Sequence, residues 1–304
     1  MLTHYHLDHH GSVGKGGIWY LLEKVGFTFG KFIYRNAGIY KGSKLSECNV
    51  NTINWNNVGQ VSTATTEFIC YATSVNEKTK LSQIAEKAKI CSTNQINPPD
   101  DQAEVEITIR DAYNVKMSDG RKINADYHKE TMPPSENDYS ICLRIQYGDF
   151  VYVTCGDLTG NDEEPEDAKH LYNDVESSIA TMIGEVDVLK VNHHGSRSST
   201  NKNWCKTLKP TVAVISCGDT SAMPHTRPLK NLQDVNSQVY LTNICNEEVT
   251  AKFDNVMSFQ TDVVVKYKLG AESFIVLKPN GDYSATYSVK KNKKQREECK
   301  SLPE

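Results

Sequence analysis

The stretch T-H-Y-H-L-D-H-H-G, residues 3–11, decides how the rest of this chain is interpreted. Alternate residues leaving a strand end point to one side, so His4, His6 and Asp8 can converge, with His9 adjacent. Imidazoles and a carboxylate suit zinc, and also manganese or iron. So many ligand-type residues are costly to keep together without a metal. The stretch therefore predicts a metal site, and the alternative is a polar loop whose histidines only hydrogen-bond.

Most of the histidines gather at three places in the sequence. They are His4, His6, His9 and His10, then His193 and His194, then His225. We expect His10, and the isolated His128 and His170, to be solvated or to support ligands rather than to bind metal.

Strands alternate with helices along the chain, which predicts an α/β fold. The predicted strands are 30–36, 104–110, two within 139–157, 186–191, 211–218, 238–243 and a hairpin at 272–289. The predicted helices are 13–26, 74–90, 164–183 and 227–235.

Composition gives weaker guidance. The net charge of −4 provides no overall attraction to nucleic acid or acidic lipid. No apolar run approaches the roughly 18–20 residues of a membrane span, and no signal peptide is recognised. The nine cysteines form no C-x-x-C pair, so we expect free thiols and a cytoplasmic protein. Cys142 and Cys155 are interpreted as small core residues.

H-x-H-x-D-H resembles the signature of the metallo-β-lactamase superfamily. Three later segments resemble its competence-protein branch, which includes a DNA-uptake channel protein and phosphorylcholine esterases. They are PPSENDYSICLRIQYGDFVYVTCGDLTG (133–160), VDVLKVNHHGSRSST (186–200) and SCGDTSAMPHTRPL (216–229). The resemblance covers about residues 1–40 and 135–290, and it implies an αββα sandwich.

The resemblance also implies a set of ligands for two divalent ions. His4 and His6 would hold the first ion, Asp8 and His9 the second, and Asp157 would bridge them. His194 is assigned to the first ion, although either histidine of the pair could be the ligand, and His225 would complete the second. Two such ions share a water and lower its pKa, so that hydroxide exists near neutral pH.

Asp8 and His193 are the predicted catalytic residues. Asp8 would bind metal and hydrogen-bond the hydroxide, and His193 would donate a proton to the departing oxygen. Ser196 and Arg197 could bind a phosphate or carboxylate. The alternative for this SRSST stretch is a polar turn that caps the next helix.

The chain departs from the superfamily pattern at its start, because almost no strand precedes the histidines. We therefore expect a sandwich that lacks part of the N-terminal sheet, and a homodimer could complete it. The predicted domain is 1–290, with a polar insertion at 45–130 that shapes substrate access. A basic tail, 291–304, is expected to be solvated or to touch a nucleic-acid backbone.

The favoured function is a metal-dependent hydrolase acting on phosphodiester bonds, with nucleic acid or a small phosphodiester as substrate. One alternative is hydrolysis of a β-lactam, lactone or thioester by the same hydroxide. Another is a metal-binding subunit without catalytic activity. We expect no membrane partner.

Overall fold

The fold comes from a computed structural model. It describes residues 1–12, 15–35, 37–55, 62–74, 84–109, 135–161, 173–218 and 222–299. His128, His170 and most of the helix predicted at 74–90 lie outside these residues.

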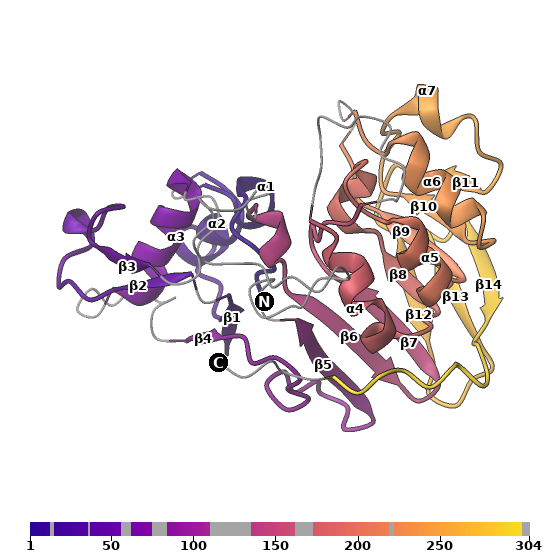
Figure 1. The fold of residues 1–304 in the computed structure, drawn as a ribbon, viewed down its shortest axis with the longest axis horizontal. Coiled ribbons are helices and arrows are strands. Elements are labelled where there is room, and N and C mark those ends of the chain that lie inside the picture. The colour runs from indigo at the N-terminus through magenta and orange to yellow at the C-terminus, as the bar shows by residue number, and fades with distance from the viewer. Residues whose placement is uncertain are drawn as a thin grey trace.

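A seven-stranded sheet forms the centre of the molecule, in the order β11-β10-β9-β8-β7-β6-β5 (Figure 1). The five strands from β7 to β11 run parallel, and β5 and β6 add antiparallel pairs at one side. The strands are β5 (Ala103–Ile109), β6 (Cys142–Tyr147), β7 (Phe150–Thr154), β8 (Val188–Lys190), β9 (Val212–Ile215), β10 (Gln238–Leu241) and β11 (Val256–Ser258).

Both faces of this sheet are buried. In β9, Ala213 and Ile215 pack with the helices, whereas Val212 and Val214 pack with a second sheet. The helices are α4 (Val175–Ile183), α5 (Lys202–Leu208) and α6 (Thr226–Gln233), with the short α7 (Glu247–Thr250) nearby. The second sheet is antiparallel and contains β12 (Val264–Tyr267), β13 (Ser273–Leu277) and β14 (Ser284–Ser288).

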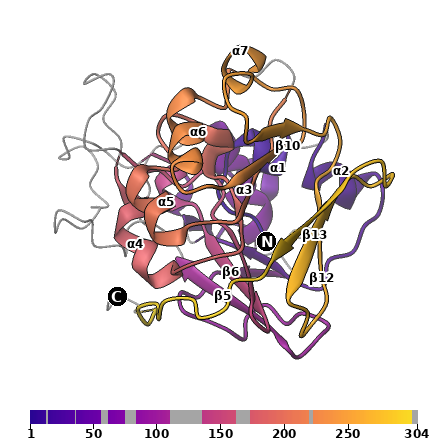
Figure 2. The same ribbon diagram turned by 90° about the vertical axis from the view of Figure 1, so that its right-hand side faces the viewer.

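Figures 1 and 2 show helices on one side of the large sheet and the second sheet on the other. The predicted α/β class is confirmed, and the layers run helix, sheet, sheet.

A separate hydrophobic cluster lies at the N-terminal end of the chain, drawn in indigo and purple in Figure 1. It is built around the fully buried Phe68. Its elements are α2 (Ile18–Glu23), β1 (Phe32–Tyr34), β2 (Gly38–Tyr40), η1 (Leu45–Glu47), β3 (Ile53–Trp55), α3 (Thr63–Thr73) and β4 (Ala85–Lys87). The described part of the predicted 45–130 insertion supplies much of this cluster, and its role in substrate access stays a prediction.

Residues 1–5 connect this cluster to the large sheet. The Leu2 amide donates to the carbonyl of Ile33 in β1, and the Ile141 amide donates to the carbonyl of Thr3. The metal-ligand candidates that follow are therefore held between the two parts.

The structure pairs eight of the nine cysteines, so the prediction of free thiols is wrong for all but Cys205. The pairs are Cys48–Cys70, Cys91–Cys299, Cys142–Cys155 and Cys217–Cys245. Cys142 and Cys155 are buried in the core as expected, but as partners. The pairing removes the free thiols on which the cytoplasmic location was based, and that location stays a prediction.

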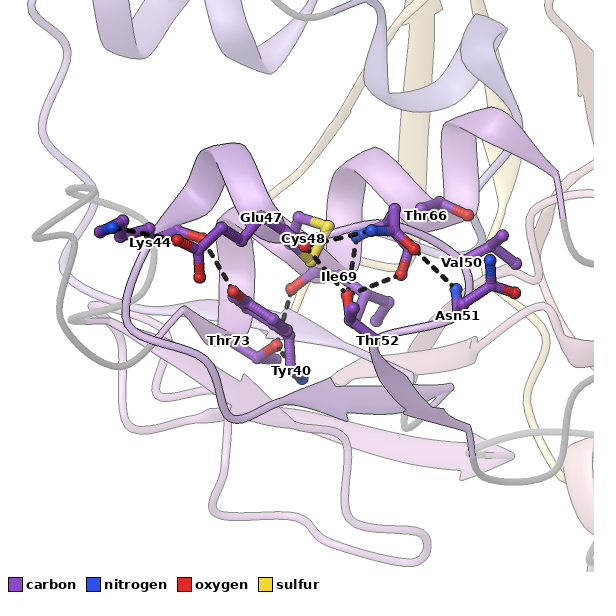
Figure 3. Close-up of a disulfide and its surroundings, with 12 residues drawn as sticks. Tyr40, Lys44, Glu47, Cys48, Val50, Asn51, Thr52, Thr66, Ile69 and Thr73 are labelled. Atoms are coloured by element: carbon purple, nitrogen blue, oxygen red, sulfur yellow. Dashed lines mark hydrogen bonds and ion pairs between the residues drawn. A yellow bond between two sulfur atoms is a disulfide. The ribbon is translucent and has the colours of Figure 1, made fainter.

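Figure 3 shows how the first disulfide ties the loop after β2 to α3. Beside it, the Tyr40 hydroxyl donates to the carbonyl of Lys44, and the Tyr40 amide donates to Thr73 Oγ1 in α3. The loop is therefore fixed by covalent and hydrogen bonds together.

Some of the basic residues after β14 contact the domain, whereas Lys291 and Lys294 are exposed. Lys293 Nζ lies 2.9 Å from the buried Asp187 carboxylate, and Arg296 makes two hydrogen bonds to Glu106, of 2.9 and 2.8 Å. Cys299 is joined to Cys91. We call residues 290–299 the C-terminal strap. In the part of the chain that the structure describes, no helix is long and apolar enough to cross a membrane.

Candidate metal centre

The predicted ligands meet at the carboxyl ends of the parallel strands β7, β8 and β9. Asp157 follows β7 and the His193–His194 pair follows β8, in the 3-10 turn η5 (Asn192–Gly195). Ligands in open α/β sheets commonly bind at this edge. Residues 4–9, with Asp8 and His9 in the short helix α1 (Leu7–His10), reach the same place from the N-terminal side.

The first group of candidate ligands is His4, His6 and Asp157. His4 is fully buried, and its Nε2 lies 3.2 Å from His6 Nδ1 and 3.7 Å from Asp157 Oδ2. Burial holds the pKa of His4 well below its usual range, so the ring is neutral and offers a lone pair.

The second group is Asp8, His9, Asp157 and His194. His9 Nε2 lies 3.1 Å from Asp157 Oδ1, and His194 Nε2 lies 3.4 Å from Asp8 Oδ2. Both Nε2 atoms are buried, and neither makes a hydrogen bond. A buried polar atom without such a partner is unfavourable, and a cation between these atoms would satisfy both.

Asp157 belongs to both groups, as a bridging carboxylate would. Burial opposes its ionisation, but His9, His4 and His193 together hold its pKa below the usual range. The neighbouring His194 imidazole, whose Nε2 lies 3.4 Å from the carboxylate, is the main cause that lowers the pKa of Asp8 to about 2. Both carboxyl groups are therefore anionic, which divalent ions require.

The two histidines of the pair have different roles in the geometry. Both have left-handed backbone conformations, with φ of 46° at His193 and 53° at His194, which non-glycine residues seldom adopt outside functional sites. His194 Nδ1 lies 2.7 Å from the Ser216 carbonyl, so it carries the proton and leaves Nε2 for a metal. His193 uses both nitrogens, with Ser198 Oγ at 3.2 Å and Asn137 Nδ2 at 3.4 Å.

The grouping differs from the expected ligand assignment in two respects. His194 lies with Asp8 and His9, not with His4 and His6, and its Nε2 is 3.8 Å from Asp157 Oδ1. His225 is in neither group: it precedes α6 with its amide bonded to the Gly195 carbonyl.

His10 is also outside both groups. Its Nε2 lies 3.1 Å from the Tyr5 carbonyl, and its Nδ1 accepts from Trp19 Nε1. It supports the polypeptide beside the site, which agrees with its expected role.

The predicted substrate-binding residues differ in exposure. Arg197 is exposed, but Ser196 is buried, with its hydroxyl 3.2 Å from Ser198 Oγ. Ser199 Oγ donates to the carbonyl of Asn192. The serines therefore act mainly as a polar turn, and only Arg197 is available to a ligand.

Glycine is required next to α1. Gly11 has φ of 80°, and a Cβ there would collide with the carbonyl of Gly16. A side chain at this position would force the turn after the ligand helix to open.

Sequence reasoning missed three residues that contact the site from η4 (Asn137–Tyr139) and its flanks. Glu136 accepts a hydrogen bond from the Tyr5 amide, Asn137 contacts His193, and Ser140 Oγ accepts from the Asp157 amide. Their segment was quoted for its resemblance but was interpreted as a loop. The one signal available was that polar residues directly precede an apolar strand.

Part of the chain is similar in sequence to two known proteins. ComE operon protein 3 of Bacillus subtilis (strain 168) is 30% identical over 113 residues, 36% of this chain and 13% of that protein. Recombination protein 2 of Haemophilus influenzae is 25% identical over 128 residues, 41% of this chain and 15% of that protein. The matched region is thus a small part of each relative.

No family model matches the chain. A mutant of CmlA beta-hydroxylase is a structural neighbour with 10% identity and a TM-score of 0.39, over 79% of this chain and 42% of that one. The relatives are consistent with the competence-protein resemblance at a coarse level.

Proposed function

We propose that this chain is a metal-dependent hydrolase that holds two divalent ions, zinc first among them, and cleaves phosphodiester bonds. The observation that carries the proposal is the pair of ligand groups that share Asp157. His4 and His6 would hold one ion, and Asp8, His9 and His194 the other. Two such ions supply an activated water and stabilise negative charge at phosphorus.

The chain's own residues orient and protonate the substrate in this proposal. Asp8 has a side chain that is 61% exposed, so its carboxylate faces the open side of the centre. His193 is 21% exposed and is held at its two nitrogens by Ser198 and Asn137. It would exchange one of these hydrogen bonds for one to the departing oxygen when it donates a proton. Arg197 would pair with a phosphate oxygen.

Two points favour a phosphodiester over a carbonyl substrate. One relative is named a recombination protein, and phosphodiester bonds link nucleic acids. In addition, an exposed arginine beside paired metal-ligand groups is suited to an anionic phosphate. Lys291, Lys293 and Arg296 of the strap already contact carboxylates, so these three add little to a nucleic-acid surface.

The test measures metal content and hydrolysis on the wild type and on Asp157→Asn, which keeps the side-chain shape. The substrates are bis-p-nitrophenyl phosphate, single-stranded DNA, RNA and nitrocefin. We expect about two metals per chain and phosphodiester turnover in the wild type, and a loss of at least about a hundredfold in Asp157→Asn. Asp234→Asn, at an exposed pair with Lys230, is the control.

Turnover of nitrocefin alone would replace the proposal with carbonyl hydrolysis. Metal binding without turnover of any substrate would favour a non-catalytic metal-binding role.

A further inference from the structure

Three segments that are far apart in the sequence supply the candidate ligands, and one short segment contacts all three. The segment is Glu136–Ser140, which contains η4. Glu136 accepts from the Tyr5 amide at 2.8 Å, Asn137 Nδ2 lies 3.4 Å from His193 Nε2, and Ser140 Oγ accepts from the Asp157 amide at 3.1 Å.

The segment is itself rigidly held. The Glu136 carboxylate pairs with the buried Arg35 guanidinium, which lies 4.7 Å from the ring centre of Tyr5 and 4.6 Å from that of Tyr139. The buried Asp138 accepts from the Ser135 amide at 2.8 Å and from Asn173 Nδ2 at 2.9 Å. A segment fixed on both sides can hold its neighbours in place.

Two of the contacts can be removed without leaving a buried charge. Ser140 is fully buried, and its hydroxyl contacts the backbone of the residue shared by both ligand groups. Asn137 is 8% exposed and contacts the ring next to His194. Removing Glu136 instead would strand the Arg35 charge and disturb folding.

We propose that Asn137 and Ser140 are positioning residues of the dinuclear centre, which act through His193 and Asp157 to set the spacing of the two ligand groups. The inference rests on the proposed metal site, but it does not depend on the substrate or on turnover. Ser140 bonds to the backbone of the shared ligand, and Asn137 bonds to the residue next to a ligand. Replacing residues in the shell around metal ligands typically changes metal affinity about 10–100-fold.

The experiment measures zinc affinity by competition with a chromophoric chelator, for the wild type, Asn137→Ala and Ser140→Ala. Ser237→Ala is the control, because Ser237 is equally buried and its hydroxyl donates to the Pro210 carbonyl away from the site. We expect about 10–100-fold weaker zinc binding in the two test variants and an unchanged affinity in the control.

Cobalt substitution supplies a readout that a purely structural role would not move. The visible spectrum of bound Co²⁺ reports ligand geometry, so it should change in Asn137→Ala and Ser140→Ala but not in Ser237→Ala. Thermal unfolding of the metal-free proteins checks that each variant is folded. Wild-type zinc affinity and an unchanged cobalt spectrum in both variants would overturn the inference. A wild type that binds metal but hydrolyses nothing would overturn only the proposed function.

Discussion

Tyr5 lies between two candidate ligands, and every polar group on it is engaged. Its amide donates to Glu136, its carbonyl faces His10 Nε2, and its hydroxyl donates to the Arg35 carbonyl. The ring packs 4.8 Å from that of Phe68, in the N-terminal cluster. A residue anchored in this way fixes the histidines before and after it, although it cannot itself bind the metal.

Substitution of His10 distinguishes a metal ligand from a residue that only stabilises the polypeptide beside the site. We expect His10→Gln to keep two metals but to lower the free energy of unfolding by about 1–3 kcal/mol, because Tyr5 and Trp19 lose buried hydrogen bonds. Metal analysis and urea unfolding measure the two effects. His9→Gln is the matched comparison and should lose one metal. Loss of metal in His10→Gln would place His10 among the ligands.

Glu176 lies in α4 and holds the turn after the histidine pair. Its carboxylate accepts from Asn192 Nδ2 and from the amides of Thr200 and Asn201, at 2.7, 2.6 and 2.8 Å. Burial outweighs these hydrogen bonds and raises the pKa of Glu176 to about 8.

This raised pKa makes stability depend on pH. The folded state binds the proton more tightly than the unfolded state, so the contribution of Glu176 is fully present below about pH 4.5 and is lost as pH rises through about 8. The loss should be on the order of a few kcal/mol. Urea unfolding of the metal-free protein between pH 5 and 9 should show it, and Glu176→Gln should remove most of the slope. An equal slope in both proteins would assign the effect to another group.

At the scale of elements, the C-terminal strap joins the edge strand β5 to the end of α4. Arg296 binds the Glu106 carboxylate in β5 and the Met182 carbonyl in α4, and Glu297 bonds to the carbonyl of Thr181. Because Glu106 is buried, removing Arg296 would leave its charge unpaired and would lower the free energy of unfolding.

We expect Arg296→Met to lower the free energy of unfolding by about 1–3 kcal/mol and to release the strap to hydrogen exchange. Lys291→Met is the matched control, because Lys291 pairs with Glu272 where both side chains are largely exposed. The control should leave the free energy of unfolding almost unchanged, because an exposed ion pair contributes little. Equal effects of the two substitutions would show that the strap contributes no more than a surface pair.

The elements that were predicted correctly have either a continuous apolar run or a clear alternation of apolar and polar residues. The strands β6 to β10, the helix α6 and the β13–β14 hairpin appear where the pattern indicated. Residues 85–87 were predicted as helix but form β4, because pairing with β1 overrides their helical spacing. Helix α3 was missed because it is rich in threonine, and it depends on the Ser62 cap and on burial.

The sequence predicts the residues of the site whose side chains can bind metal, but not the backbone contacts that position them. Clustered histidines and aspartates predict a metal site, so we expected these side chains to lie close together. The contact of Tyr5 with Glu136 joins residues 131 positions apart, and an amide donor leaves no mark in the sequence. The left-handed turn that moves His194 to the second group is equally invisible, because no glycine occupies that position.

At the scale of the whole molecule, the metal centre joins the N-terminal cluster to the central sheet. His4 and His9 come from one side, and Asp157 and His194 from the other. Bound metal should therefore stabilise both parts together.

Zinc at about 100 times its dissociation constant should add about 2.7 kcal/mol to the stability of the folded state. We expect a rise in melting temperature of several degrees, reversed by a chelator, and a single transition for both parts. Scanning calorimetry with and without zinc measures it. Asp234→Asn should respond like the wild type, and an unchanged melting temperature would mean that the two groups do not hold metal.

The Cys91–Cys299 bond closes the chain between these residues into a covalent ring that contains the whole seven-stranded sheet. A pull on the two ends of the molecule would pass through the sulfur atoms and bypass that sheet. Only the chain outside residues 91–299 could then lengthen, apart from the loop closed by Cys48 and Cys70, at about 3.5 Å per residue. Under load the metal centre would separate at the histidine segment, while the half that holds Asp157 kept its shape.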